Sequence, residues 1–427
     1  MNAKWKINNE TIRHCATLLS GTAMAQGITF LAYPVIARLY SAAQFGAYTT
    51  LLSWLDVFVI LATCRYEQAI MLTSSVRDTS AVVKLCKSLC ALVSTMVAIG
   101  IIVLLCTRGE NSTINWEFMF LPLLVFFTGQ YRIYLLLSNK HKGYKQISLS
   151  EIVVSISTTT GKICGGLLKM FRIGLPLATL LGRILGNVCY WRSLRKLALP
   201  KVSNAEVKAA AINYRNFPLY STPKDFINSL SINLPFTLLA IYFEQSSIGL
   251  FSMAFTFTFR PVNLLNSAYE RVLYQRVAEK YNNKQPIMKD VLRFFAYNYL
   301  ALIPLFVLLY IFAEPLMTIL LGKEWSNVAI YFRYMLPWAL VMVAGSSLSF
   351  IPNIFSVQRT EAILYFILFP IRAGVLFIGV AFGNFSLAIA LFCGAGALFV
   401  FGLTAWYFSL LRRYDRNLKT PLSTPTI

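Results

Sequence analysis

The chain has 427 residues, of which 57% are apolar and 13% charged, whereas an average soluble domain is about 45–50% apolar and about 25% charged. This composition, with a mean hydropathy of +0.61, excludes an ordinary soluble globular protein. The net charge of +22 would suit a nucleic-acid-binding protein, so the basic residues have to be placed relative to a membrane before they are interpreted.

The apolar runs predict an all-α, polytopic membrane protein. A bilayer core about 30 Å thick takes about 20 helical residues, so the chain has room for about twelve spans. The longest connection is basic and polar and separates two sets of six spans. We expect an N-terminal six-helix bundle at 1–191, a cytoplasmic linker at 192–217, a second bundle at 218–411 and a cytoplasmic tail at 412–427. The predicted spans are 14–38, 45–71, 88–107, 117–138, 147–170, 175–191, 218–243, 248–275, 294–312, 327–355, 361–382 and 386–411.

The basic residues outside the spans are distributed unevenly between the two sides. Most fall on the side of the N-terminus, and the opposite side holds only Arg108, Lys169, Arg172 and Lys323. The positive-inside rule therefore predicts that both termini are cytoplasmic. It also explains most of the net charge, so we expect no nucleic-acid partner.

Basic residues outnumber acidic ones within the predicted spans. Those within two turns of a span end, such as Arg65 and Arg132, are expected to snorkel to the interface. Lys162, Arg183, Arg260 and Arg372 lie too deep for that, and each would cost about 2.5–3.5 kcal/mol if it faced lipid. The bases are Arg38, Arg65, Arg132, Lys162, Arg183, Lys224, Arg260, Arg271, Arg333 and Arg372, and the acids are Asp56, Glu67, Glu151, Asp225, Glu270 and Glu361. A cavity with this excess would attract an anionic head group.

Helical spacing places many of these charges on polar stripes, for which two interpretations remain open. The stripes can line a shared aqueous lumen, or they can join helices by hydrogen bonds worth only about 0.6 kcal/mol each. The lumen explains the deep Arg and Lys residues better. Three of the stripes are Thr49, Ser53, Asp56, Thr63 and Glu67, with Arg65 pointing the opposite way; Glu151, Ser155, Thr158, Lys162 and Lys169; and Arg260, Asn263, Ser267, Arg271 and Tyr274.

Motifs for enzymatic chemistry are missing from the sequence. There is no GxxxxGK[ST] phosphate loop, no GxSxG nucleophile elbow and no His or Cys pattern typical of zinc. We expect a carrier that is no enzyme and has neither a cofactor nor a metal site. Asp56 and Asp225 are the candidates for coupling transport to a proton or sodium gradient, because a carboxylate inside a span has to be neutralised or paired.

Several short motifs resemble a known family. Pro34–Tyr40 with Gln44–Tyr48, Ile248–Phe251, and Arg260–Asn263 with Arg271–Tyr274 resemble the Wzx-type polysaccharide flippases of the multidrug/oligosaccharidyl-lipid/polysaccharide (MOP) exporter superfamily. The pattern of Pro34–Tyr40, Gln44 and Gly46 also recurs weakly at Pro235–Tyr242, Gln245 and Gly249, which favours two parallel repeats of six helices.

This resemblance implies a carrier of the bacterial inner membrane that moves undecaprenyl-diphosphate-linked oligosaccharides, such as O-antigen repeat units, by alternating access. Its partners would be the lipid-linked substrate, membrane lipid and polysaccharide polymerase or chain-length proteins. Arg38 is carried over from the family's first-helix motif, while Lys162, Arg183, Arg260 and Arg372 are substrate-binding candidates on physical grounds alone. A MATE-type drug exporter coupled to a cation remains the alternative, and a membrane glycan polymerase is a further one.

Overall fold

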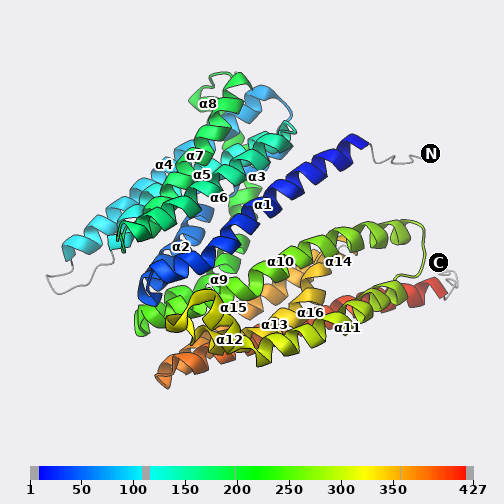
Figure 1. The fold of residues 1–427 in the computed structure, drawn as a ribbon. Coiled ribbons are helices and arrows are strands. Elements are labelled where there is room, and N and C mark those ends of the chain that lie inside the picture. The colour runs from blue at the N-terminus through cyan, green and yellow to red at the C-terminus, as the bar shows by residue number, and fades with distance from the viewer. Residues whose placement is uncertain (1–8, 108–115, 198, 356, 420–427) are drawn as a thin grey trace. The chain divides into compact units, whose positions relative to one another are not determined.

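The computed structural model describes residues 9–107, 116–197, 199–355 and 357–419, apart from the side chains of residues 9–20, Lys196, Arg271, Gln275 and Lys419 (Figure 1). Within these ranges the chain forms helices and short connections, with no strand. It divides into two compact units, Met1–Thr237 and Leu238–Ile427, so the boundary falls inside the ninth α-helix.

The first unit is built around α6, which packs against both α1 and α7. α5 packs against α4 and α7, and α2 packs against α4 and α5. The helices of this unit are α1 (Asn9–Leu39), α2 (Ala42–Thr63), α3 (Tyr66–Ala69), α4 (Val76–Thr107), α5 (Leu121–Lys140), α6 (Tyr144–Leu167), α7 (Gly174–Leu194) and α8 (Asn204–Asn213), followed by α9 (Thr222–Tyr242), which crosses the boundary.

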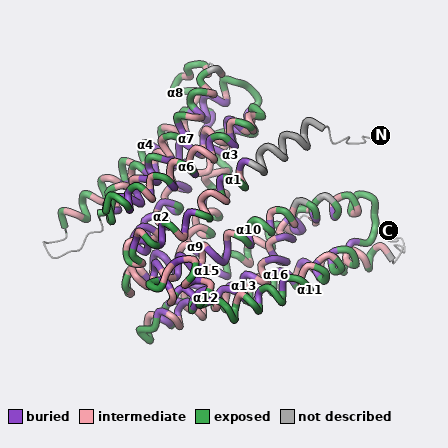
Figure 2. Tube along the Cα trace, viewed as in Figure 1, coloured by how far each residue is buried: buried purple, intermediate pink, exposed green. Residues whose placement is uncertain are grey.

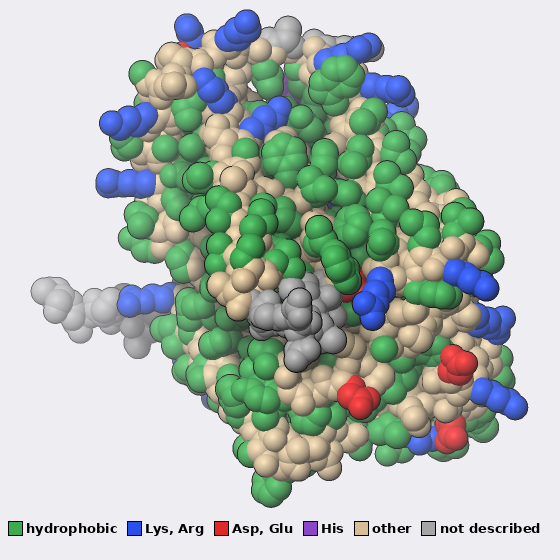
Figure 3. Space-filling view, turned by 90° about the vertical axis from the view of Figure 1, so that its left-hand side faces the viewer, with side chains coloured by type: hydrophobic (Ala, Val, Ile, Leu, Met, Phe, Trp, Pro, Cys, Tyr) green, Lys and Arg blue, Asp and Glu red, His purple; other side chains and the backbone are tan. Residues whose placement is uncertain are grey.

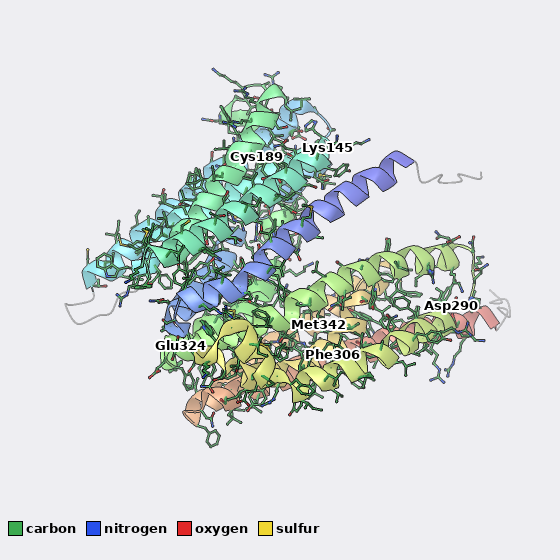
Figure 4. All side chains as sticks on the ribbon, in the orientation of Figure 1. Lys145, Cys189, Asp290, Phe306, Glu324 and Met342 are labelled. Atoms are coloured by element: carbon green, nitrogen blue, oxygen red, sulfur yellow. The ribbon has the colours of Figure 1, made fainter. Side chains whose placement is uncertain are left out.

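The second unit is built around α13, which packs against α10 and α16, while α15 packs against α16. The end of α10 is fastened to the start of α11, because Lys280 forms an ion pair with Asp290, which is labelled in Figure 4. α10 also contains Pro261. The helices are α10 (Gln245–Asn282), α11 (Met288–Ile311), α12 (Ala313–Leu321), α13 (Val328–Ser347), α14 (Ile351–Ile354), α15 (Gln358–Ala381) and α16 (Phe385–Lys419).

The long helices lie at the predicted spans, which confirms the all-α, multi-span prediction. Twelve of the described helices have 20 residues or more, and eight of these are long and apolar enough to cross a membrane by length and composition. The four that are less apolar are α1, α6, α7 and α9. Three of them, α1, α6 and α7, pack together, so polar side chains are concentrated at one set of helix interfaces.

The outward faces of the helices carry the apolar residues that a bilayer requires. On α4, Leu92, Met96 and Ile99 are each more than half exposed, and buried residues lie along the inner faces of the helices in each unit (Figure 2). On the face drawn in Figure 3, hydrophobic side chains are widespread and Lys and Arg gather toward the margins. Contiguous exposed apolar surface of this extent is expected of a membrane protein and not of a soluble monomer.

The second predicted span is interrupted in the structure, which corrects the polar stripe drawn through it. α2 ends at Thr63 because Cys64 and Arg65 adopt left-handed backbone conformations, with φ of 44° and 58°. Such values are uncommon for residues other than glycine, and composition does not signal them. Glu67 therefore lies on α3, and the helical spacing that set Arg65 opposite the stripe does not apply to it.

The polar linker contains a helix that the hydropathy pattern missed. Ser203 caps α8 by accepting a hydrogen bond from the Glu206 backbone N–H, and the Glu206 carboxylate accepts one from the Ser203 N–H at 2.7 Å. Glu206 also pairs with Arg77 of α4 at 2.7 Å. The capping box and this ion pair attach α8 to the first unit.

Candidate functional site

Part of the predicted polar stripe joins α1 to α6. The Thr22 hydroxyl donates to Glu151 Oε2 at 2.6 Å, and the Thr29 and Ser155 hydroxyls lie 2.8 Å apart. Ser155 also donates to the Ala25 carbonyl at 2.6 Å. At these positions the hydrogen-bond interpretation of the stripe describes the structure, since each side chain is used between helices.

Lys162 lies in the same helix but in an aromatic environment. Its side chain is only 6% exposed, and its Nζ lies 4.7 Å from the centre of the Tyr48 ring. The Tyr48 hydroxyl is hydrogen-bonded to Thr179 at 2.7 Å, and the Tyr40 hydroxyl donates to the Lys162 carbonyl. The ring face stabilises the ammonium group electrostatically in place of water.

The helices α2, α5 and α7 bring Asp56 and Arg183 into one electrostatic cluster. Arg183 is half-buried, with its Cζ 5.0 Å from the centre of the Tyr131 ring. Asp56 interacts electrostatically with both Arg132 and Arg183. The Asp56 side chain keeps surface that no protein atom covers, although it lies two turns from the end of its helix. Arg132, which was expected to snorkel, thus belongs to the charge cluster of the first unit.

Asp225, the second coupling candidate, forms an ion pair that the sequence did not reveal. Its Oδ2 lies 2.7 Å from Arg65 Nε, and Arg65 Nη1 lies 3.4 Å from Glu67 Oε1. Arg65 and Asp225 side chains are about one-fifth exposed, and Glu67 is buried. The prediction that a neighbouring base would offset Asp225 is consistent with this geometry. The prediction that Arg65 would snorkel is wrong, because the turn at Cys64 directs it to these carboxylates.

In the second unit, Arg372 is the counterpart of Lys162 by its position in the predicted spans. It is 6% exposed and lies over two rings, with its Cζ 5.4 Å from the Trp338 centre and 5.0 Å from the Phe392 centre. Arg260 is half-buried and directly precedes Pro261 in α10. The Arg271 side chain lies outside the described residues.

Arg38 is exposed in the last turn of α1. The structure therefore groups Asp56, Arg132 and Arg183, pairs Asp225 with Arg65, and keeps Lys162 and Arg372 deep inside their own units. The aromatic residues that hold the cations, Tyr48, Tyr131, Trp338 and Phe392, were not predicted, because aromatic side chains are too frequent in membrane helices to mark a site. No cluster of His, Cys, Asp and Glu suited to a metal occurs in the described parts of the chain.

The architecture is that of known transporters. An inward-facing structure of a multidrug resistance MATE family transporter of the MOP superfamily is similar with a TM-score of 0.69 at 13% identity, covering 94% of this chain and 99% of that one. The lipid II flippase MurJ in an inward closed conformation gives 0.71 at 14% identity, covering 94% and 90%. A MATE transporter from Vibrio cholerae gives 0.52 at 12% identity, covering 96% and 98%. The chain is thus a multi-pass helical membrane protein with the fold of the MOP superfamily.

The family follows from the sequence. The model of a family described as polysaccharide biosynthesis protein matches residues 35–330. No curated protein matches the chain. Because the family match spans well over half of the chain, this protein belongs to the polysaccharide biosynthesis protein family.

Proposed function

We propose that this protein is a flippase that moves undecaprenyl-diphosphate-linked oligosaccharide repeat units across the bacterial inner membrane by alternating access. Family membership places it in polysaccharide biosynthesis, and the fold is shared with proteins described as transporters and as a lipid II flippase. The substrate, the membrane, and any polymerase or chain-length partners belong to the proposal.

The observation that carries it is the state of the deep cations in the first unit. Among the described residues, no carboxylate oxygen lies within ion-pair distance of Lys162 or Arg183, which instead lie over tyrosine rings. Two positive charges inside the helix bundle, with no carboxylate at ion-pair distance and Asp56 acting on Arg183 only from farther away, favour an anionic ligand, and a diphosphate has the charge to supply it. Arg183 is half-buried and can contact the anion directly, while Lys162 is buried and acts on the anion mainly through its positive charge at a distance. Arg38, Arg260 and Arg372 are further candidates for the same anion.

The test is translocation of a fluorescent undecaprenyl-diphosphate oligosaccharide in proteoliposomes that contain equal amounts of folded protein. We expect Arg183→Ala to lower the initial rate at least tenfold, and Arg183→Lys to retain part of it, because the charge survives without the planar fork. Arg333→Ala is the matched control, since Arg333 is half-buried like Arg183 and also lies near a ring, Tyr310, but its Nε already donates a hydrogen bond to the Tyr310 carbonyl at 3.1 Å. Arg260→Ala is expected to behave like Arg183→Ala. Wild-type rates for both Arg183→Ala and Arg260→Ala would overturn the anion site.

Asp56 is the stronger of the two coupling candidates within this proposal, because Asp225 is already paired with Arg65. Asp56 is exposed and lies in the field of two arginines, so its protonation would change the balance of charge beside Arg183. Asp56→Asn should remove the dependence of transport on an imposed proton or sodium gradient while substrate binding is retained. An unchanged gradient dependence would exclude Asp56 from coupling.

The orientation of the chain also belongs to the proposal. The uneven distribution of Lys and Arg supports cytoplasmic termini. A reporter fused after Arg413, or within 201–208, should be active only as a cytoplasmic reporter, and one near Gly322 only as a periplasmic one. Reversed readings would place the basic connections outside the cell and contradict the proposed direction of transport.

A further inference from the structure

The second unit contains a polar cavity of about 320 Å³ that the cationic site does not include. Four helices or their ends contribute to its lining: α10, α13, α15 and α16. Its polar wall is formed by Asn263, Asn266, Ser267, Glu270 and Ser349, with Tyr365 on the α15 side. Polar residues from separate helices thus converge on one space within helices that are otherwise apolar.

One side chain of this wall, that of Asn266, has an amide nitrogen without a hydrogen-bond partner among the described residues. Asn266 is only 6% exposed, and in the part of the chain that the structure describes its Nδ2 has no hydrogen-bond partner. Its Oδ1 lies 3.5 Å from the hydroxyl of Ser347, whose own hydrogen is donated to the Val343 carbonyl at 2.6 Å. A buried donor without a partner costs about 1–3 kcal/mol, so Asn266, which lines the cavity, gains a hydrogen bond when its amide turns toward a ligand oxygen there.

The remaining polar groups are held in place with hydrogen-bonding capacity left over. Glu270 Oε1 accepts from the Ser349 hydroxyl at 3.4 Å. The Tyr407 hydroxyl donates to Glu361 Oε1 at 2.6 Å, which fixes the Tyr407 ring at the cavity. A Cβ at Gly345 would lie 2.5 Å from Val400 and 2.8 Å from Thr404, so glycine allows α13 and α16 to close this wall.

The chemistry of the wall suits a sugar ring. Amide, hydroxyl and carboxylate groups with aromatic faces can satisfy many hydroxyls on one ring, and the volume lies at the small end of ligand pockets, which span about 300–1,000 Å³. A metal ion would need about six oxygens at 2.3–2.6 Å around one point, whereas this wall is spread over a space many times larger. Among the side chains that the structure describes, which do not include Arg271, no Lys or Arg lines the cavity and Glu270 does, so its carboxylate would repel an acidic sugar.

We propose that this cavity binds one uncharged or amino sugar of the cargo and disfavours uronic acids. The inference rests on the proposed function, because it assigns one glycan residue of the same lipid-linked substrate. Along the axis of α10, Asn266 lies about 9 Å from Arg260 at 1.5 Å per residue. A diphosphate near Arg260 and a sugar in the cavity can therefore belong to one molecule, which places the sugar near the lipid end of the glycan.

Binding of free sugars to the purified full chain in nanodiscs tests the proposal without transport. Saturation-transfer NMR would use N-acetylglucosamine, glucosamine and glucuronic acid as probes. We expect signals from the first two and none from glucuronic acid. Asn266→Leu should weaken the binding of N-acetylglucosamine at least about fivefold, because one hydrogen bond to the sugar is lost. Glu270→Gln should admit glucuronic acid, because the repelling charge is gone while the shape is kept. Asn282→Leu and Glu279→Gln, both exposed near the end of α10, are the controls.

Each outcome is decisive for the cavity. Equal binding of all three probes, or no effect of Glu270→Gln on glucuronic acid, overturns the proposal even if Asn266→Leu folds poorly. A spectral change produced by sodium chloride alone, with no sugar signal, would identify an ion site and also overturn it. Translocation of the labelled lipid-linked substrate is measured on the same preparation. Intact translocation without sugar binding removes only the cavity assignment, whereas intact sugar binding without translocation removes the proposed function.

Discussion

The two units contain buried cations at corresponding predicted spans but use their polar residues differently. In the first unit, Thr22, Thr29, Glu151 and Ser155 are consumed by hydrogen bonds between α1 and α6. In the second, the polar residues around Asn266 border an open cavity. Lys162 lies over one tyrosine, whereas Arg372 lies over a tryptophan and a phenylalanine. A polar stripe in the sequence therefore does not tell whether its residues join helices or receive a ligand. The hydrogen-bond partner of each polar atom in the structure does.

The largest change in stability should come from crowding the contact between α6 and the start of α7 in the first unit. A Cβ at Gly165 would lie 2.9 Å from Gly174 Cα and 3.0 Å from the Tyr40 hydroxyl. Gly165→Ala should lower the free energy of unfolding by about 1–3 kcal/mol through overpacking. Thermal unfolding in detergent measures it. Gly374→Ala, where nothing lies within 4 Å, is the control and should not destabilise the protein. An equal melting temperature for both variants would show that α6 and α7 can separate freely.

Breaking the ion pair between Arg65 and Asp225 should have a smaller effect. Arg65→Ala leaves Asp225 and Glu67 without their base, and we expect a loss of about 1–2 kcal/mol, below the about 3–5 kcal/mol of a fully buried pair because water reaches both side chains. The double variant Arg65→Asp with Asp225→Arg is the check for the pair itself. If it recovers none of the lost stability, the contribution of Arg65 comes from Glu67 or from the turn at Cys64.

Removing a polar residue that joins helices should lower the free energy of unfolding, whereas removing one that borders the cavity should not lower it. Thr29→Val deletes a hydrogen bond between α1 and α6 and should destabilise by about 0.6 kcal/mol. Asn266→Leu deletes a buried donor that has no partner and should leave the stability unchanged or raise it, since the desolvation cost is removed. Unfolding of both variants without sugar decides this. Destabilisation by Asn266→Leu comparable to that by Thr29→Val would mean that Asn266 is a structural residue.

The smallest effect concerns α8, outside the membrane spans. The Ser203 backbone N–H and hydroxyl, followed by Arg77, hold the pKa of Glu206 below its ordinary value. Because the folded-state pKa is the lower one, this support is complete above the unfolded pKa and is lost as the pH falls through the folded pKa. Proteolysis of the linker should therefore be slow near neutral pH and accelerate only as the pH falls below 4.5, the ordinary pKa of glutamate. In the Glu206→Gln variant the linker should be cleaved at the same rate at neutral and at acidic pH. If cleavage of that variant still accelerates in acid, another group is responsible for the effect.

The positions of the membrane helices could be predicted from the sequence, because a long apolar run in a bilayer has few alternatives to a helix. Helix ends were less predictable: α4, α10 and α16 extend well beyond the apolar runs, since a helix continues into water wherever its polar residues permit. α8 had a readable signal in Ser203 and Glu206, which form the capping box that hydropathy ignores.

The contacts of the site could be predicted only in part. Burial of Lys162 and Arg372 followed from the cost of facing lipid, but their aromatic partners depend on packing between helices. Arg65 was misplaced because two left-handed residues, Cys64 and Arg65, interrupt a run that reads as one helix. The cavity around Asn266 could not be predicted, because its residues are distributed over four helices and only the fold brings them together.

The length of α10 has a mechanical consequence. From Pro261 to Asn282 the helix continues for about 32 Å at 1.5 Å per residue. If the helix bends by about 10° at the proline, its far end moves by about 6 Å, while the atoms near Pro261 move by less than a bond length. A small rotation at Pro261 therefore produces a much larger displacement at the C-terminal end of α10. This end is joined to α11 through the ion pair between Lys280 and Asp290. A spin label or fluorophore at Asn282 would register the transport cycle more sensitively than one beside the substrate.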